Sequence, residues 1–383
     1  MRNPPDPSAD NRPLLLLAGN DVPTVLNLRM NLIRALGGAG YRVSVAAPPH
    51  EAAKQLAEQG IDFFPVKMRA TGTRPWSDAA LLWRFLRLLR RTKPVAILGF
   101  TVKPNVYGSL AARLFGIRVI NNITGLGTAF ISSGVLEALV TTLYRPALRK
   151  SDAIFFHNEE DRQLFIQKGI ARSDQAIVIP GSGIDLAKYK PAPLPGTSDS
   201  PTFLLIGRLI SEKGVREFVE AARQMKAEWP NARFQLLGDL ATGPRAIAPG
   251  EVEEWVAKDG IEYLGSAPDV RPFIARADCI VLPSYREGLP RSLLEGAAMA
   301  RPLVATDAPG CRNLVEPGNT GFLCEVRSGP SLAEAMSRIA GLSSDNRVAM
   351  GKRARKMVED RYSDERVNNA YLMALRTRSR STD

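Results

Sequence analysis

One stretch of the sequence, SYREGLPRSLLE, indicates the fold most directly; it runs from Ser284 to Glu295. It follows the short apolar run Cys279–Leu282, which predicts a buried parallel strand that ends in a loop. Ser292 and Glu295 have the spacing of a capping box, so a helix should begin near Ser292. The order of strand, Gly- and Pro-containing loop and helix N-terminus presents backbone N–H groups and the positive end of a helix dipole to an anion.

Two glutamates in this stretch, Glu287 and Glu295, are eight residues apart. A diphosphate held between them would leave each carboxylate free to accept hydrogen bonds from hydroxyl groups on either side. Sugar hydroxyls are the natural donors for such a pair. Two glutamates at this spacing also occur by chance, and Glu295 alone could be an ordinary helix cap, so the pair needs support from other motifs.

Two further motifs lie upstream: GRLISEKG at residues 207–214, directly after the apolar run Phe203–Ile206, and PGSGID at residues 180–185. Together with the paired glutamates, they resemble family 4 of the retaining GT-B glycosyltransferases, in which the three elements belong to one nucleotide-sugar site. The resemblance extends over residues 14–371. It implies an α/β protein of GT-B architecture, with two Rossmann-like domains that face each other across a cleft.

The domain organisation follows from alternating strand-like and helix-like segments on both sides of a Pro-rich segment, Lys190–Pro201, which predicts two parallel sheets. The first domain lacks a G-x-G-x-x-G fingerprint, which disfavours a dinucleotide-dependent dehydrogenase. The expected parts are a flexible leader (1–12), an N-terminal acceptor domain (13–190), a linker (191–201), a C-terminal nucleotide-sugar domain (202–362), a C-terminal helix (363–376) and a basic tail (377–383). The return of that helix to the first domain is implied by the resemblance.

The resemblance also implies the roles of the donor-side residues. Glu287 would contact the donor sugar, Glu295 the ribose hydroxyls, and Arg208 with Lys213 would neutralise the diphosphate as the sugar leaves. Glu287, Arg208 and Lys213 are therefore the predicted catalytic residues. The other predicted donor-binding residues are Gly207, Tyr263, Gly288, Leu289 and Pro290. The chain has no Asp-x-Asp motif, so no metal ion is expected, and the only co-substrate is a nucleotide sugar, taken as UDP-linked from the resemblance.

Two loops of the expected first domain resemble the subset of the family that builds lipid-linked bacterial surface glycans. They are TVKPN at residues 101–105 and TGLG at residues 124–127, each directly after a predicted strand. Ligands bind at the carboxyl ends of strands in open α/β sheets, and in this subset the first domain holds the acceptor, a lipid-diphosphate-linked saccharide. The residues predicted on the acceptor or phosphate side are Gly19, Asn20, Lys103, Thr124 and Gly125.

The charge of the chain points to anionic partners. Its 51 Lys and Arg against 39 Asp and Glu give a formal net charge of +12. The predicted helix Asp78–Arg91 interleaves apolar residues with Arg84, Arg87, Arg90 and Arg91; it could lie on an anionic membrane surface, or it could be an ordinary helix that covers the sheet. Nucleic acid is not an expected partner, because no recognised binding motif is present.

Localisation is predicted from what the sequence contains. No run approaches the roughly 20 apolar residues of a membrane-spanning helix, and Met1–Arg12 has no apolar segment typical of a signal peptide. The three cysteines, Cys279, Cys311 and Cys324, have no metal-binding spacing, as expected in a reducing compartment. We therefore expect a cytoplasmic protein that is peripheral to the inner face of the cytoplasmic membrane.

The predicted function is retaining, metal-independent transfer of a hexose or N-acetylhexosamine to a polyprenyl-diphosphate-linked saccharide in surface glycan synthesis. Two alternatives remain open: a glycosyltransferase with a soluble acceptor, and a sugar-nucleotide epimerase of the same fold. An epimerase would need acid and base groups, and the chain has only two histidines, His50 and His157. His157 follows a predicted strand and is expected to be structural.

Overall fold

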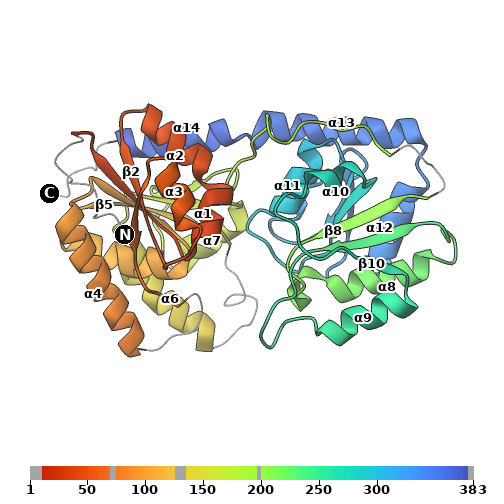
Figure 1. Cartoon of the computed structure of the whole chain (residues 1–383), viewed down its shortest axis with the longest axis horizontal. Coiled ribbons are helices and arrows are strands. Elements are labelled where there is room, and N and C mark those ends of the chain that lie inside the picture. The colour runs from red at the N-terminus through yellow and green to blue at the C-terminus, as the bar shows by residue number, and fades with distance from the viewer. Residues whose placement is uncertain (1–10, 70–74, 126–134, 196–199, 378–383) are drawn as a thin grey trace. The chain divides into compact units, whose positions relative to one another are not determined.

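The structure is a computed structural model that describes residues 11–69, 75–125, 135–195 and 200–377 (Figure 1). Contacts within the chain divide it into two compact units, one of residues 1–183 with 364–383 and one of residues 184–363. The boundary lies at Gly183 rather than at residue 190, because Ile184 and Tyr189 are buried in the core of the second unit.

The first unit contains a parallel seven-stranded sheet with the strand order β3-β2-β1-β4-β5-β6-β7. Its strands are β1 (Leu14–Ala18), β2 (Arg42–Ala47), β3 (Asp62–Pro65), β4 (Ala96–Phe100), β5 (Arg118–Ile123), β6 (Ala153–Phe156) and β7 (Ala176–Val178). Its helices are α1 (Val22–Leu28), α2 (Met30–Gly38), α3 (Ala53–Glu58), α4 (Pro75–Thr92), α5 (Ser109–Arg113), α6 (Val135–Leu148), α7 (Glu159–Gln167) and α14 (Asp364–Arg376). The central strands are almost entirely apolar because helices cover both faces of the sheet (Figure 1).

The second unit contains a parallel six-stranded sheet with the order β10-β9-β8-β11-β12-β13. Its strands are β8 (Thr202–Ile206), β9 (Arg233–Leu237), β10 (Ile261–Tyr263), β11 (Cys279–Leu282), β12 (Leu303–Thr306) and β13 (Gly321–Cys324). Its helices are α8 (Val215–Met225), α9 (Pro249–Lys258), α10 (Arg271–Ala275), α11 (Arg291–Ala298), α12 (Gly329–Ala340) and α13 (Ser344–Arg361). The two parallel sheets confirm the predicted α/β class.

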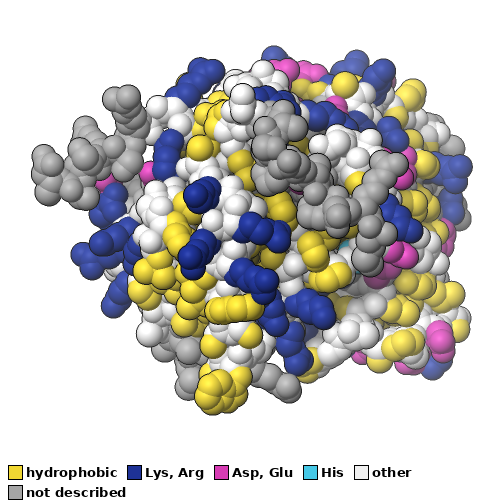
Figure 2. All heavy atoms as spheres, turned by 60° about the vertical axis from the view of Figure 1, so that its left-hand side comes forward, with side chains coloured by type: hydrophobic (Ala, Val, Ile, Leu, Met, Phe, Trp, Pro, Cys, Tyr) yellow, Lys and Arg dark blue, Asp and Glu magenta, His cyan; other side chains and the backbone are white. Residues whose placement is uncertain are grey.

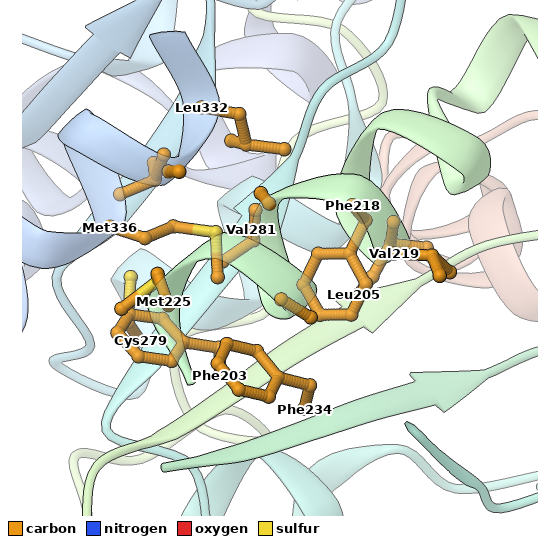
Figure 3. Close-up of a cluster of buried hydrophobic side chains, with 14 of the residues drawn as sticks. Phe203, Leu205, Phe218, Val219, Met225, Phe234, Cys279, Val281, Leu332 and Met336 are labelled. Atoms are coloured by element: carbon orange, nitrogen blue, oxygen red, sulfur yellow. The ribbon is translucent and has the colours of Figure 1, made fainter. Parts of the chain in front are cut away.

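The core of the second unit joins β8, β9 and β11 to α8 and α12 (Figure 3). The rings of Phe203 and Phe234 stack with their centroids 5.7 Å apart. Cys279 lies in the same cluster and is fully buried, so this thiol serves as a small apolar core residue. All three cysteines are buried and free.

The C-terminal helix α14 packs on the sheet of the first unit. Tyr371 is fully buried, its ring meets that of Phe155 edge-on at 4.6 Å, and its hydroxyl oxygen accepts a hydrogen bond of 2.6 Å from Asn122 Nδ2. The guanidinium of Arg118 donates to the carbonyl oxygens of Leu375 and Ala374, at 2.6 and 2.7 Å. A cation at these last carbonyls satisfies the C-terminus of the helix and its dipole, so α14 is an integral part of the first unit.

Candidate active site

The candidate site lies at the carboxyl edge of the second sheet, where the strand order reverses. From β8 the chain proceeds outward through β9 to β10, and then crosses to β11 on the other side of β8. The loops that follow β8 and β11 therefore flank a topological switch point, the usual ligand position in open α/β sheets. The two loops touch: the backbone N–H of Tyr285 donates to the carbonyl oxygen of Glu212 at 2.9 Å, and the hydroxyl oxygen of Ser284 lies 2.9 Å from the same carbonyl oxygen.

This contact brings together the predicted catalytic residues Lys213 and Glu287. The Lys213 ammonium donates to Oε1 of Glu287, and the Ser284 hydroxyl donates to the same oxygen at 2.7 Å. The two charged side chains are 22% and 17% exposed, so a ligand can reach the ion pair. Because an ammonium has three donors, Lys213 can remain bound to Glu287 while it donates to an incoming phosphate oxygen.

Two glycines in left-handed conformations allow the loops to approach so closely. Gly214 has a φ of 69°, and a Cβ there would lie 2.1 Å from the carbonyl oxygen of Pro283. Gly310, in the loop after β12, has a φ of 81°, and a Cβ there would lie 2.3 Å from the carbonyl oxygen of Glu287. Glycine is required at both positions, since any side chain would displace the backbone that carries Glu287.

The loop after β8 also positions Gly207 and Arg208. The aliphatic carbons of Lys213 pass over Gly207, with Cδ 3.7 Å from where a Cβ would stand. Arg208 is exposed on the same loop. The loop therefore carries both predicted cations at the carboxyl edge of the sheet, and the lysine is held by a carboxylate of the second loop.

The predicted capping box at Ser292 and Glu295 is wrong. Helix α11 begins at Arg291, Pro290 occupies the N-cap position with extended backbone angles, and no side chain caps the helix. Oε1 of Glu295 instead accepts hydrogen bonds from the Tyr189 hydroxyl and from Arg291 Nε, both at 2.8 Å. Proline already ends the loop one residue earlier than expected, so the carboxylate of Glu295 is directed to the side of the helix.

Tyr189 is an unforeseen member of this site. Its burial, followed by the nearby Glu295 carboxylate, raises the pKa of its hydroxyl, so it remains a hydrogen-bond donor at neutral pH. The Arg291 guanidinium lies over its ring, 5.6 Å from the centroid. No sequence motif indicated Tyr189, which is 106 residues from Glu295. Ser284, also unforeseen, had one signal: it is the first polar residue after the β11 strand.

The other donor-side residues lie along the same edge. Gly288, Leu289 and Pro290 form the end of the loop that precedes α11. Tyr263 ends the edge strand β10, and its hydroxyl donates to the carbonyl oxygen of Gly238, after β9, at 3.1 Å. Its ring is therefore placed two strands away from the Lys213–Glu287 pair along the same sheet edge.

The predicted acceptor residues follow three adjacent strands of the first unit. Gly19 and Asn20 follow β1, Lys103 follows β4, and Thr124 with Gly125 follows β5. The remainder of the second predicted loop, residues 126–127, lies outside the described residues. Lys103 is not open to solvent: its ammonium donates to Asp78 Oδ1 of α4 at 2.7 Å, and the two side chains are 11% and 10% exposed.

His157 is buried and directly follows β6. Burial, and then the charge of Arg29, lowers the pKa of the imidazole to about 3, so it is neutral at pH 7. Its Nε2 atom has no hydrogen-bond partner among the described residues. The imidazole therefore cannot serve as a surface acid or base, in agreement with a structural role. Within the described ranges no group of three His, Cys, Asp or Glu side chains could hold a metal ion.

Comparison with family models matches both units. Residues 28–181 match the model described as "Glycosyl transferase 4-like domain", and residues 200–341 match "Glycosyl transferases group 1". The second match includes Gly207, Arg208, Lys213, Glu287 and Glu295, whereas Tyr189 lies outside it.

The proteins similar to the chain include two curated bacterial enzymes and one solved structure. The N,N'-diacetylbacillosaminyl-diphospho-undecaprenol alpha-1,3-N-acetylgalactosaminyltransferase of Campylobacter jejuni is 25% identical over 82% of this chain and 86% of its own length. The UDP-Gal:alpha-D-GlcNAc-diphosphoundecaprenol alpha-1,3-galactosyltransferase of Escherichia coli is 25% identical over 68% and 70%. The crystal structure of Anabaena HepE in complex with UDP-glucose superposes with a TM-score of 0.76 at 19% identity, over 95% of this chain and 99% of that one.

Proposed function

Because the chain belongs to the glycosyltransferases that carry these two domains in a GT-B fold, we propose that it extends a polyprenyl-diphosphate-linked saccharide. The donor is a UDP-linked hexose or N-acetylhexosamine, and the new bond keeps the anomeric configuration of the donor. The observation that carries the proposal is the contact of Lys213, Glu287 and Ser284 at the switch point of the second sheet.

The donor diphosphate is proposed to bind where the loops after β8 and β11 meet. Lys213 and the exposed Arg208 supply positive charge there, and helix α11 begins directly after the second loop. These fixed cations stabilise the diphosphate as it leaves, so the transfer needs no metal ion. The departing phosphate takes the proton of the attacking acceptor hydroxyl on the same face of the sugar, and no second carboxylate of the glycosidase type is required.

Glu287 is proposed to accept hydrogen bonds from the donor sugar. Its Oε1 is held by Lys213 and Ser284, which orients the carboxylate before any ligand arrives. A carboxylate that is already oriented loses little side-chain entropy when the sugar binds. Glu295, held by Tyr189 and Arg291, is proposed to accept from the ribose hydroxyls in the same way.

The acceptor is proposed to be lipid-linked, since both curated relatives are named for transfer to diphosphoundecaprenol-linked saccharides. Among the described helices, none is both long and apolar enough to cross a membrane. The protein would then reach such an acceptor from the membrane surface, and the basic helix α4, with Arg84, Arg87, Arg90 and Arg91, is the proposed contact.

The test is an assay with a panel of UDP-linked sugars and lipid-linked saccharides extracted from bacterial membranes. We expect one donor to release UDP only when the extract is present, and to yield a glycolipid that is one sugar heavier and retains the donor configuration. An inverted product would contradict retention. Transfer to water-soluble glycans alone, or conversion of the donor to its epimer without an acceptor, would overturn the proposal.

A further inference from the structure

Helix α4 has two different sides. Leu81, Phe85 and Leu89 are buried against the sheet, so this helix does cover the sheet as an ordinary helix of the fold would. On its other side, an open groove of about 730 Å³ lies between α4 and the edge strand β3. Figure 2 shows that this side of the first unit interleaves Lys and Arg with hydrophobic side chains.

The groove has an apolar floor and a basic rim. Phe63, Phe64 and Leu88 contribute to the floor, and the described residues that line the groove include no Asp or Glu. The rim carries Lys67 and three arginines of α4, Arg84, Arg87 and Arg91. Their spacing of three and then four residues places the arginines on one face of the helix. Arg90 is exposed on the same helix but does not line the groove.

The three guanidinium groups are held in place by neutral partners. Arg84 Nη1 donates to the carbonyl oxygen of Lys67 at 2.9 Å. The Arg87 guanidinium lies over the Trp83 ring, 5.5 Å from its centroid, and that of Arg91 lies over Phe64, at 5.6 Å. A guanidinium that contacts a ring or a carbonyl keeps its charge uncompensated. Among the described residues none forms an ion pair with these three arginines, so the rim can bind an anion without first breaking one.

Two exposed tryptophans of α4, of which Trp83 lines the groove, indicate which kind of anion the groove binds. Trp76 and Trp83 are 89% and 58% exposed and lie seven residues apart on α4, and therefore on the same side of the helix. Tryptophan is enriched at the interface between water and the bilayer, where its ring is apolar and its N–H is wet. A soluble phosphate would use the arginines but would leave these rings and the apolar floor without contacts.

We propose that the groove between α4 and β3 binds the headgroup of one anionic phospholipid of the bilayer surface. Arg84, Arg87 and Arg91 hold its phosphate, and Phe63, Phe64 and Leu88 contact the glycerol and the first acyl carbons. The inference rests on the proposed membrane-surface function and makes it more specific. Arg84, Arg87 and Arg91 form a defined binding site, whereas Arg90 lies outside it.

The experiment compares the single variants Arg84→Gln, Arg87→Gln and Arg91→Gln with the matched control Arg90→Gln, each of which removes one charge from α4. The probe is dihexanoyl phosphatidylglycerol below its micelle concentration, followed by tryptophan fluorescence. We expect saturable binding to the wild type, with an affinity about tenfold lower in each groove variant and within about twofold of wild type in Arg90→Gln. Dihexanoyl phosphatidylcholine, which has no net charge, should bind far more weakly.

Several outcomes would overturn the site. If Arg90→Gln weakens binding as much as the groove variants do, the attraction is diffuse and no lipid site exists, while membrane docking stands. If inorganic phosphate competes at the same concentration as the lipid, the groove is an anion site that does not use its apolar floor. If the wild type ignores phosphatidylglycerol vesicles at low salt, membrane docking fails as well. The wild-type assay with membrane-extracted lipid-linked saccharides distinguishes the two proposals. If it releases no UDP, the transferase proposal fails, whereas the lipid-binding measurements still decide the groove site.

Discussion

Two lysines of this protein follow strands in different units, and each is paired with a carboxylate. Lys213, after β8, binds Glu287 from the neighbouring loop of the same sheet edge, and the two side chains are 22% and 17% exposed. Lys103, after β4, binds Asp78 in the first turn of α4 at 2.7 Å, and these side chains are 11% and 10% exposed. The first pair joins two loops at a switch point, whereas the second joins a loop to a covering helix.

The surroundings of the two carboxylates also differ, because Glu287 is the more accessible of the two. Glu287 shares its oxygen with the hydroxyl of Ser284 at an accessible edge. Asp78 lies beside Tyr107, whose pKa is raised to about 12, first by burial and then by the Asp78 carboxylate. A lysine–carboxylate ion pair can therefore join two loops at an accessible sheet edge in one unit and hold α4 against the strand ends in the other. Exposure and the origin of the partner, rather than the residue types, separate the two roles.

The largest effect is expected for Glu287→Ala. Turnover should be abolished while UDP still binds. The donor sugar loses the carboxylate that accepts its hydrogen bonds, but Lys213 and Arg208 still bind the diphosphate. Isothermal titration with UDP and a UDP-release assay measure the two quantities. Glu295→Ala is the matched variant, and it should mainly weaken UDP binding, by about 1.5–3 kcal/mol for a hydrogen bond to a charged acceptor. Equal losses of UDP affinity in the two variants would show that the roles are assigned wrongly.

The second effect is a loss of rate in Lys213→Met. One stabilising contact to a developing charge contributes about 10²–10³ in rate, so turnover should fall by that factor with little change in the melting temperature. Lys258→Met provides the control, since Lys258 is an exposed lysine paired with Glu254 on α9. Wild-type turnover in Lys213→Met would remove the ammonium from the proposed mechanism.

The third effect concerns stability. Lys103→Met leaves the buried Asp78 without its cation, which should lower the free energy of unfolding by about 1–3 kcal/mol. Chemical denaturation measures it, with Lys213→Met as the less buried counterpart. The predicted acceptor role of Lys103 would add a higher KM for the lipid-linked saccharide. An unchanged unfolding midpoint would contradict the idea that this pair holds α4 in place.

The smallest effect is expected from removing metal ions. If Lys213 and Arg208 provide the positive charge at the leaving diphosphate, turnover should persist in excess EDTA. Complete inactivation that Mn²⁺ restores would instead show that these two cations are insufficient.

Local sequence determined the elements and the identity of the family. The apolar run Cys279–Leu282, the Gly- and Pro-containing loop and the helix after it were predictable, because strand and helix patterns depend on neighbouring residues. The motifs at 207–214 and 284–295 also allowed the family to be predicted, because each motif lies within a single strand–loop–helix unit. The predicted start of α11, at Ser292, was one residue late. The spacing of Ser292 and Glu295 suggested a capping box, but Pro290 occupies the N-cap position and the helix begins at Arg291.

Only the tertiary structure decided the partners of the charged side chains. Lys213 and Glu287 are 74 residues apart, Glu295 and Tyr189 are 106 apart, and Lys103 and Asp78 are 25 apart. The rim of the groove likewise combines Arg84 from helix α4 with Lys67 from the segment that follows the edge strand β3. Such pairs form only when strand order and helix packing bring distant segments to one edge, and no local pattern encodes that order. The sequence by itself therefore determined which chemical groups the protein carries, and the packing of the sheets decided which of them meet.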